Sequence, residues 1–305
     1  MAKNTIHTNS RSRRANAARR RRAYALYALC GLAICLAAAF GLRALLRPAP
    51  DASAPASGQM QAQSETEQVK ATQAASEAQA EATPAPTMDL TDVKALPVIY
   101  RAKNPGKKVA ITVDDCFSPE NTRAILDLAE KYEIKLTFFP IGRIVKRDPQ
   151  LWRDILEKGH EIENHSYHHS NILNMTDEEL YNTIVWQNEV MNEVLGVNYH
   201  MRYFRPMGGN GTKTKRLHKV LGDLGYAAVA SWGLSGNRPA EDTIRLTEAG
   251  QILLFHATDT DLSRLKKVIP GLLDKGFKLV TINELYGKEP NLVAPADTPA
   301  PSEAL

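Results

Sequence analysis

Short apolar runs alternate with amphipathic stretches between about residues 90 and 287. Helical patterns lie between most of the runs, and strands that alternate with helices predict an α/β fold with a parallel sheet, open or closed into a barrel. Seven runs have the length and the β-branched or aromatic content of buried strands. They are 107–113, 135–142, 160–166, 202–207, 226–232, 250–256 and 278–285.

Two helical patterns carry clear end signals. The segment 118–132 opens with Ser-Pro and has a glutamate in its first turn. The longer one has Thr176 and Glu179 at the spacing of a capping box and ends at Gly196. We therefore expect one helix between the first and second predicted strands and another between the third and fourth.

The N-terminal region has the pattern of a membrane anchor. Residues 1–22 contain eight basic residues and no acidic one, and the next twenty positions are uncharged. Twenty apolar residues are enough to cross a bilayer, and flanking arginines stay on the cytoplasmic side. We expect an uncleaved single-pass anchor at 23–46, with the tail in the cytoplasm and the remainder outside. A cleaved signal peptide is the alternative, but no clear small-x-small cleavage site closes this segment.

The overall charge of +4 comes from that tail. Beyond residue 50 the chain has 38 − 10 = 28 basic and 34 acidic residues, a net charge of −6. An arginine-rich tail is also typical of a nucleic-acid arm. Because this one adjoins the apolar segment, it favours the membrane, and we expect no nucleic-acid partner.

Composition also divides the rest of the chain. Residues 47–89 are rich in Ala, Gln, Ser and Pro and predict a linker, while 288–305 predict a disordered Pro/Ala-rich tail. The folded domain is then 90–287. Cys116 is its only cysteine, so no disulfide within the domain can form and a hydrophobic core must stabilise it.

Polar residues follow several predicted strands directly. The carboxyl ends of parallel strands meet on one face of such a fold. Taken singly, these residues have ordinary roles in turns, in caps, on the surface or in the core. Together, one carboxylate and two imidazoles match a hydrolytic zinc site with an open position. The polar residues that follow the predicted strands are Asp114, Asp115, His165, His169, Arg205 and His256.

Three histidines fall in the stretch "ENHSYHHSN". On a strand or on a helix, the spacing of His165 and His169 places them on one face, and His168 lies off it. We expect the first two to converge on one point and His168 to be a loop residue that binds no metal.

The order of these motifs resembles the polysaccharide deacetylases of the NodB-homology group, carbohydrate esterase family 4, over roughly 105–287. "TVDD" is similar to the family's first motif and "HSYHH" to its second. The resemblance implies Asp114 as catalytic base and Asp115, His165 and His169 as ligands of a divalent metal. Zinc is the first expectation, with cobalt, manganese and nickel as alternatives.

The remaining motifs imply further roles. "FRP" implies that Arg205 pairs with the base, and "LFH" implies His256 as general acid with Leu254 in the pocket for the acetyl methyl. Gly208 would supply a backbone N–H to the oxyanion, and Trp232 marks the fourth motif. The implied fold is a distorted, incomplete (β/α) barrel of about seven parallel strands.

The implied activity is metal-dependent N-deacetylation of N-acetylhexosamine units in an extracellular polysaccharide, with peptidoglycan first. We expect a monomeric catalytic domain. Two alternatives stay open: a degenerate glycan-binding module that does not hydrolyse, and an O-acetyl esterase.

The chain departs from the family pattern at three places. Cys116 stands where glycine is usual, and we expect it to act as a small neutral residue. Met207 and Gly208 replace the family's Pro-Tyr. The fourth motif, "SWGLSGNRP", lacks the carboxylate that orients the general acid.

Other residues could replace that carboxylate. Ser235 and Asn237 in the same motif could serve only as neutral partners of His256. We expect an aspartate from another loop, Asp242 or Asp259, to compensate.

Overall fold

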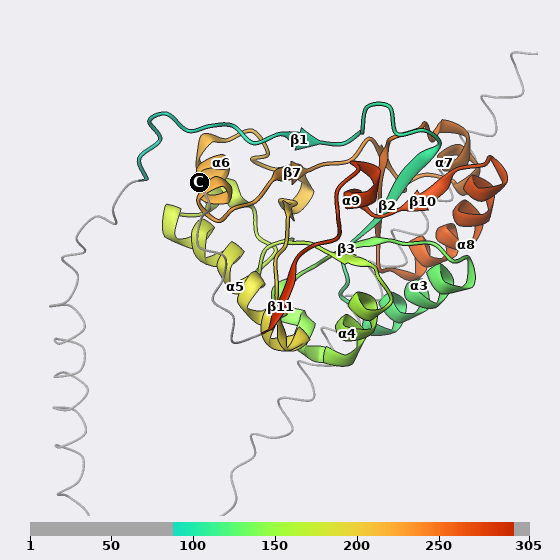
Figure 1. Ribbon diagram of the computed structural model, residues 1–305, viewed down its shortest axis with the longest axis horizontal. Helices are drawn as coiled ribbons and strands as arrows, with labels where there is room; N and C mark the ends of the chain where they lie inside the picture. The colour runs from blue at the N-terminus through green and yellow to red at the C-terminus, as the bar shows by residue number, and fades with distance from the viewer. Residues whose placement is uncertain (1–87, 296–305) are drawn as a thin grey trace, which may run out of the picture. The chain divides into compact units, whose positions relative to one another are not determined.

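A parallel sheet forms the centre of the fold. The computed structural model describes residues 88–295. Its central strand, β2 (Lys108–Asp115), pairs with β3 (Thr137–Pro140) on one side and with β9 (Ile252–His256) on the other (Figure 1). The outer strands are β4 (Glu161–Ile162) and β8 (Leu234–Ser235), and β10 (Lys278–Val280) pairs with the start of β2. All of these pairings are parallel.

A second small parallel sheet extends the first. It contains β1 (Val98–Ile99), β7 (Ala228–Ala230) and β6 (Tyr203–Phe204) in that order. A parallel bridge between Asn164 and Phe204 joins the two sheets. The predicted α/β fold with a parallel sheet is confirmed, and each of the seven predicted runs contains a strand.

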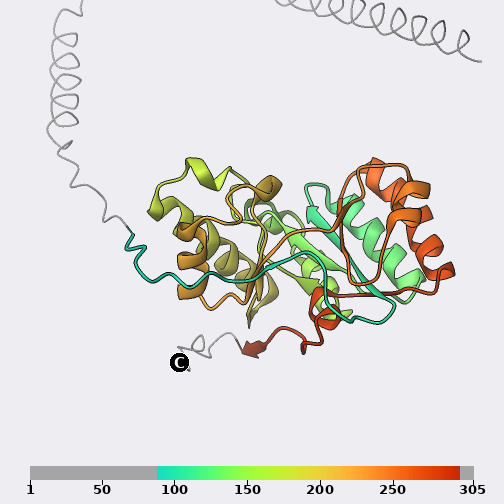
Figure 2. The same ribbon diagram turned by 90° about the horizontal axis from the view of Figure 1, so that it is seen from above.

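Helices surround these strands. In Figures 1 and 2, α3, α7 and α8 lie together on one side and α5 and α6 on the other, with β2 and β3 between. The helices are α3 (Pro119–Lys131), α4 (Pro149–Glu157), α5 (Asp177–Leu195), α6 (Lys215–Asp223), α7 (Ala240–Leu246), α8 (Asp259–Asp274) and α9 (Ile282–Leu285). Three short 3-10 turns complete the described chain: η1 (Gly142–Arg147), η2 (Ile172–Asn174) and η3 (Met207–Gly209).

The predicted helix ends are confirmed. At α5 the Thr176 hydroxyl accepts a hydrogen bond from the Glu179 backbone, and the Glu179 carboxylate accepts one from the Thr176 backbone. Gly196 ends the helix with φ 71°. These interactions satisfy N–H groups that a helix start leaves unpaired.

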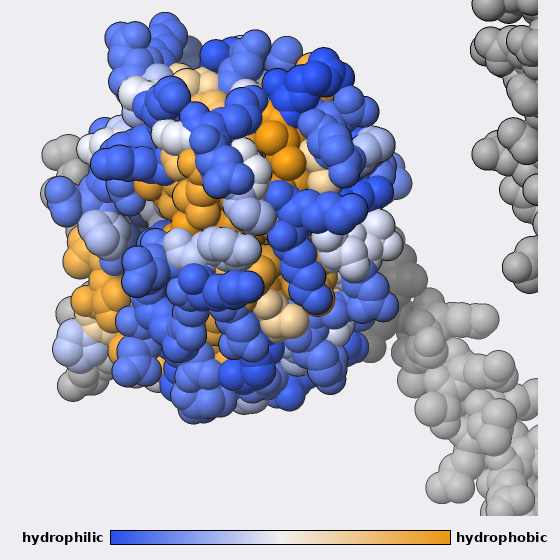
Figure 3. Space-filling view, turned by 90° about the vertical axis from the view of Figure 1, so that its right-hand side faces the viewer, coloured by the Kyte–Doolittle hydropathy of each residue, from blue (hydrophilic) through white to orange (hydrophobic). Residues whose placement is uncertain are grey.

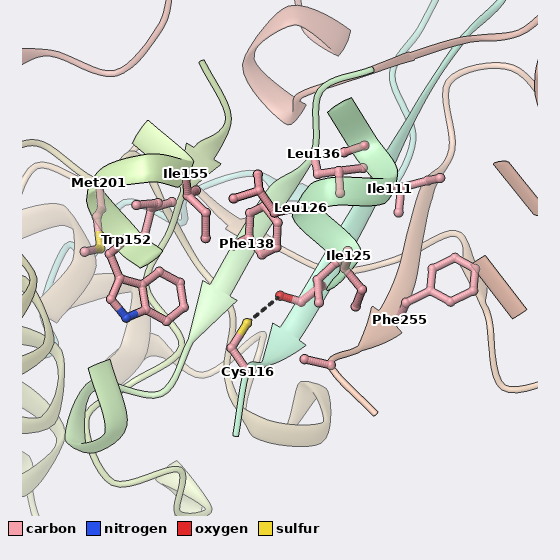
Figure 4. Packing of buried hydrophobic residues seen from close by; sticks show 14 of the residues in the cluster. Ile111, Cys116, Ile125, Leu126, Leu136, Phe138, Trp152, Ile155, Met201 and Phe255 are labelled. Atoms are coloured by element: carbon pink, nitrogen blue, oxygen red, sulfur yellow. Dashed lines mark hydrogen bonds between the residues drawn. The ribbon is translucent and has the colours of Figure 1, made fainter. Parts of the chain in front are cut away.

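Side chains on β2 alternate between a face that packs in the core and a face that carries Thr112 and Asp114. Val109, Ile111 and Val113 lie in the main hydrophobic cluster, where Ile111 packs near residues of α3 and β9 (Figure 4). Thr112 and Asp114 point to the opposite face, because neighbouring side chains on a strand alternate. The strand thus carries its catalytic candidate on the face away from the main core.

The outer surface on the α7 and α8 side is mostly hydrophilic. Figure 3 shows hydrophobic residues there only as narrow patches between hydrophilic ones. In the described part of the chain, buried hydrophobic residues far outnumber the exposed large ones, as expected for a domain without disulfides.

The C-terminal boundary of the domain differs from the prediction. β11 (Val293–Pro295) lies within the predicted tail and pairs with β5 (Val197–Tyr199) in antiparallel orientation. The buried Asn291 amide donates to the Glu163 carboxyl at 2.7 Å. The domain therefore extends to at least residue 295. The buried Glu163 carboxyl, which directly follows β4, holds this segment, and composition does not reveal such a contact.

Residues 1–87, which contain the predicted basic tail, the anchor and most of the linker, lie outside the described residues. The same holds for residues 296–305. Among residues 88–295, none of the helices combines the length and the apolar character that a bilayer crossing requires.

Candidate metal and catalytic site

The polar residues singled out from the sequence meet on one face of the sheet. Asp114 and Asp115 end β2, and His256 ends the neighbouring β9 directly across from Asp114. His165 and His169 lie in the loop after β4, and Arg205 follows β6 directly. The carboxyl ends of four parallel strands therefore supply the site, as expected for this class of fold.

Asp115, His165 and His169 form a metal-ligand set. One ligand atom from each lies within 4.8 Å of the others. Asp115 Oδ1 is 3.0 Å from His169 Nε2 and 3.4 Å from His165 Nε2. This oxygen is buried and has no hydrogen-bond partner in the described part of the chain. An orphaned carboxylate oxygen that faces two imidazole nitrogens fits a divalent cation such as zinc.

The His165 ring is oriented by the chain itself. Its Nδ1 lies 2.7 Å from the Arg205 carbonyl oxygen, which can only accept a hydrogen bond. Nδ1 therefore carries the proton, and the lone pair of Nε2 faces Asp115. In metal-binding histidines, a hydrogen bond from the ring nitrogen that does not bind the metal fixes the tautomer.

The Asp115 carboxylate is held in its charged form. Burial raises the pKa of this group, but the facing His165 and His169 imidazoles outweigh burial and hold the pKa well below its usual range. A metal ligand must be deprotonated, so this environment prepares the group for binding.

Backbone strain is concentrated at the same place. Asp115 (φ 65°), Cys116 (φ 56°), Ser166 (φ 68°) and His169 (φ 59°) all have left-handed conformations. Such conformations are unfavourable for residues other than glycine and collect at functional sites, where the surrounding structure enforces them. Four of the seven non-glycine residues with positive φ in the described part of the chain thus lie in the two segments that carry the candidate ligands.

Arg205 and Asp114 form a fully buried ion pair. One guanidinium nitrogen donates to Asp114 Oδ1 at 2.5 Å and to the Thr112 hydroxyl at 2.8 Å. The other nitrogens donate to two backbone carbonyls, and the guanidinium lies 4.0 Å from the centre of the Phe139 ring. These contacts fix the position of the Asp114 carboxylate.

His256 is paired with Asp261, which the sequence interpretation missed. Asp261 Oδ2 accepts the His256 backbone N–H at 2.9 Å and lies 3.4 Å from ring Nδ1. Hydrogen bonding to Asp261, with the charges of Asp114 and Asp115, raises the pKa of the His256 imidazole against the effect of burial. Arg264 donates to Asp261 Oδ1 at 2.7 Å and holds the carboxylate in place.

The residues expected to compensate for the missing carboxylate do not contact His256. Asp242 pairs with Arg245 on the surface, and Asp259 accepts a hydrogen bond from Asn121. The Ser235 hydroxyl accepts one from the backbone of Asn237. The aspartate that pairs with His256 is therefore neither of the two expected, but Asp261, which lies two residues after Asp259 in the first turn of α8.

A sequence signal for Asp261 was present. Thr258 caps α8, and its hydroxyl accepts a hydrogen bond from the Asp261 backbone. In a Thr-x-x-Asp start the third helical residue turns its carboxylate back toward the residues before the helix. Those residues here include His256.

Cys116 points away from the metal ligands. Its buried thiol packs in the hydrophobic cluster near Ile125 and Phe138 and donates weakly to the Val113 carbonyl at 3.7 Å (Figure 4). Burial and the nearby Asp114 and Asp115 charges raise the pKa of this thiol. The geometry agrees with a small neutral residue, and its positive φ explains why glycine suits the position.

The three predicted substrate-binding residues surround the same face. Leu254 is buried on β9 two positions before His256, so both side chains lie on one side of the strand. Gly208 sits in η3 with φ 59°, three residues after Arg205. Trp232 lies over Gly209 and lines a shallow hollow with Tyr100.

His168 lies outside the metal-ligand set. Its ring packs edge-on against Tyr167 and Trp186. The predicted separation of His168 from His165 and His169 agrees with this geometry, although the three lie in a loop and not on the strand or helix that the spacing argument assumed.

Comparison with known proteins agrees with this site. A family profile described as polysaccharide deacetylase matches residues 101–229. A peptidoglycan-N-acetylglucosamine deacetylase of Bacillus cereus is 32% identical over 206 residues, which cover 62% of this chain and 92% of that protein. The chain belongs to the polysaccharide deacetylase family.

Solved structures place it in the same fold. A pseudoenzyme of carbohydrate esterase family 4 from Bacillus anthracis is similar with a TM-score of 0.57 and 25% identity, covering 66% of this chain and 72% of the other. A family 4 acetyl xylan esterase from Clostridium thermocellum, in complex with cobalt, gives a TM-score of 0.52 and 28% identity, covering 59% and 91%. An esterase and a pseudoenzyme thus share this fold. The fold alone therefore does not indicate whether a member is active, and the catalytic groups must be compared.

Proposed function

We propose that this polysaccharide deacetylase is a metal-dependent hydrolase that removes acetyl groups from N-acetylhexosamine units of peptidoglycan. The observation that carries the proposal is the position of Asp114. It lies between the buried Arg205 guanidinium and the three-residue ligand set, directly across from His256 on β9. A base, an acid and a metal site therefore converge at one point.

Asp114 acts as the general base. The Arg205 guanidinium donates a hydrogen bond to Asp114 Oδ1, and the other carboxylate oxygen, Oδ2, lies 3.8 Å from His165 Nε2. From there it accepts a proton from the attacking water. Asp115, His165 and His169 would hold a divalent metal, which would lower the pKa of water and polarise the acetyl carbonyl.

His256 acts as the general acid. Its raised pKa keeps the imidazole protonated to higher pH than an isolated histidine. It then donates this proton to the leaving amine, so that acetate and a free amino sugar are formed. The buried Leu254 beneath it supplies an apolar wall for the acetyl methyl.

The choice of polymer and location rests on separate support. The Bacillus cereus relative and a Bacillus subtilis relative named a peptidoglycan-N-acetylmuramic acid deacetylase, 28% identical over 205 residues, support peptidoglycan. The basic tail and apolar segment at residues 1–46 support an anchor that holds a monomeric catalytic domain outside the cell.

Two other functions remain to be tested against this one. The Bacillus anthracis pseudoenzyme favours a non-hydrolytic glycan-binding module, and the acetyl xylan esterase favours cleavage of O-acetyl esters. The presence of Asp261 beside His256 argues against the first, because it supplies the carboxylate that the fourth motif lacks.

The test is acetate release by the purified protein after chelation and after reconstitution with Zn²⁺. Peptidoglycan and chitooligosaccharides serve as N-acetyl substrates, and acetylated xylan serves as the O-acetyl substrate. We expect zinc-dependent release from the N-acetyl substrates. Release from xylan alone would favour the esterase, and no release from any substrate would favour the binding module.

A further inference from the structure

Asn164 directly precedes the ligand candidate His165 and is completely buried. Its backbone forms the bridge to Phe204 that joins the two parallel sheets. The Asn164 carbonyl accepts a hydrogen bond from the Arg205 backbone N–H at 2.9 Å, and the Arg205 carbonyl in turn lies 2.7 Å from His165 Nδ1. The position of Asn164 therefore helps to determine where the His165 ring is held.

The Asn164 side chain also supports the strained backbone after His165. Its Oδ1 accepts the Ser166 backbone N–H at 2.8 Å, and Ser166 has a φ of 68°. An asparagine that accepts a hydrogen bond from the residue two positions ahead closes an Asx turn. Since a left-handed serine is unfavourable and needs support from its surroundings, this hydrogen bond helps to hold the turn that carries His165.

Three oxygens hold the other end of the Asn164 amide. Its Nδ2 lies 2.8 Å from the Tyr226 hydroxyl and 3.0 Å from both Asn188 Oδ1 and the Ile184 carbonyl. A carbonyl can only accept, so Nδ2 must face Ile184 and Oδ1 must face Ser166. The Tyr226 hydroxyl donates to Asn188 Oδ1 at 2.7 Å, which closes a network of three side chains.

Asn188 and Tyr226 reach Asn164 from two elements that carry no candidate metal ligand. Asn188 lies on α5, and the buried Tyr226 lies just before β7. Burial raises the pKa of the Tyr226 hydroxyl, so this group stays a donor at neutral pH. Buried polar networks rigidify the segments that they join when their groups find partners. The network thus fixes Asn164 from two sides.

We propose that Asn188 and Tyr226 are positioning residues of the metal site: they hold Asn164, and through it His165, in the geometry that binds the metal. This inference rests on the proposed function, since it concerns the metal that the hydrolysis requires. Residues that orient metal ligands commonly change metal affinity about ten- to a hundredfold when they are removed.

The test measures zinc affinity of the full chain in detergent by titration against a competing chelator. Tyr226→Phe removes only the hydroxyl and Asn188→Ala removes its acceptor, and each should weaken zinc binding about tenfold. Asn188→Asp keeps an acceptor for both partners and should retain the wild-type affinity. In the cobalt-substituted proteins, the visible absorption, which depends on ligand geometry, should change in the first two variants and not in the third.

Tyr199→Phe is the matched control. Tyr199 is 4% exposed, close to the 3% of Tyr226, and its hydroxyl also has two partners. It accepts hydrogen bonds from the Ile162 backbone at 3.1 Å and from the Asn291 amide at 3.0 Å. This variant should lose stability but keep the wild-type zinc affinity. Thermal unfolding of the zinc-free proteins shows that each variant is folded.

Wild-type zinc affinity in both Tyr226→Phe and Asn188→Ala would overturn the inference. An equal loss of affinity in Tyr199→Phe would also overturn it, as would an Asn188→Asp protein that binds zinc no better than Asn188→Ala.

Acetate release by the wild-type protein, measured in parallel, separates the two proposals. If the wild type releases acetate and both variants bind zinc as it does, the positioning role fails and the proposed hydrolysis stands. If the wild type binds zinc without releasing acetate and both variants bind zinc more weakly, the proposed hydrolysis fails and the positioning role stands.

Discussion

Asp261 Oδ2 accepts the backbone N–H of His256 and lies 3.4 Å from the Nδ1 atom of the same residue. The carboxylate is almost fully buried and Arg264 fixes its other oxygen. A buried, anchored carboxylate beside Nδ1 orients the imidazole and stabilises its protonated form, as in other acid–base pairs. Asp261 therefore takes the role that the fourth motif of this chain cannot supply.

Asp261→Asn should lower kcat about ten- to a hundredfold, because a neutral amide no longer stabilises the His256 imidazolium. The sign of the pH effect follows from the raised pKa of His256. Without the carboxylate this pKa falls, so the active protonated form is lost at lower pH. The alkaline limb of the pH–kcat profile should move to lower pH.

Asp259→Asn is the control for this change. Asp259 lies two residues away in the same helical turn but contacts Asn121 rather than His256. Its profile should match that of the wild type. Identical profiles for the Asp259 and Asp261 variants would show that Asp261 does not act through His256.

Metal binding should distinguish the three clustered histidines. His165→Ala and His169→Ala each remove one of three ligands and should lower zinc affinity at least tenfold. His168→Ala should retain the metal, because its ring faces Tyr167 and Trp186. Zinc content after dialysis, measured by mass spectrometry of the metal, gives the result. Equal loss in all three variants would contradict the ligand set.

Cys116 should be inert in the native protein. Its thiol is buried and its pKa is raised, whereas alkylation requires an accessible thiolate. Site-resolved alkylation followed by mass spectrometry should show modification only after unfolding. Cys116→Ala should keep full zinc content and lose about 1–2 kcal/mol of stability from the small cavity. Loss of zinc in this variant would instead identify the thiol as a ligand.

Arg205→Lys should reduce kcat/KM about a hundredfold. A lysine ammonium cannot reproduce the planar set of contacts to Asp114, Thr112 and two backbone carbonyls. The surface change Arg245→Lys is the control, since Arg245 pairs only with the exposed Asp242. Comparable activity of the two variants would argue against a role for the buried pair.

The sequence was informative where chemistry follows local pattern. Apolar runs located the parallel strands, the Thr176–Glu179 spacing located the start of α5, and strand ends placed Asp114 and His256 on one face. β1 and β8 were not predicted, because each has two residues that are only partly buried, which leaves no apolar run.

Contacts between segments that lie far apart in the chain could not be predicted from the sequence. Asn291 joins the domain because Glu163, a buried residue directly after β4, accepts its amide hydrogen bond. The sequence does not distinguish Trp186 from other helix residues, because its contact with the Tyr167 ring depends on the fold. Such pairings depend on tertiary geometry, which a single sequence does not contain.

Asp114 is proposed as the general base of an active deacetylase. The direct measurement is acetate released from chitooligosaccharides by zinc-loaded wild-type and Asp114→Asn proteins, with Asp259→Asn as control. The neutral amide in the Asp114→Asn protein cannot accept the proton, so we expect a loss of at least about a hundredfold with zinc content unchanged. Acetate release by the Asp114→Asn protein at the wild-type rate would contradict the account.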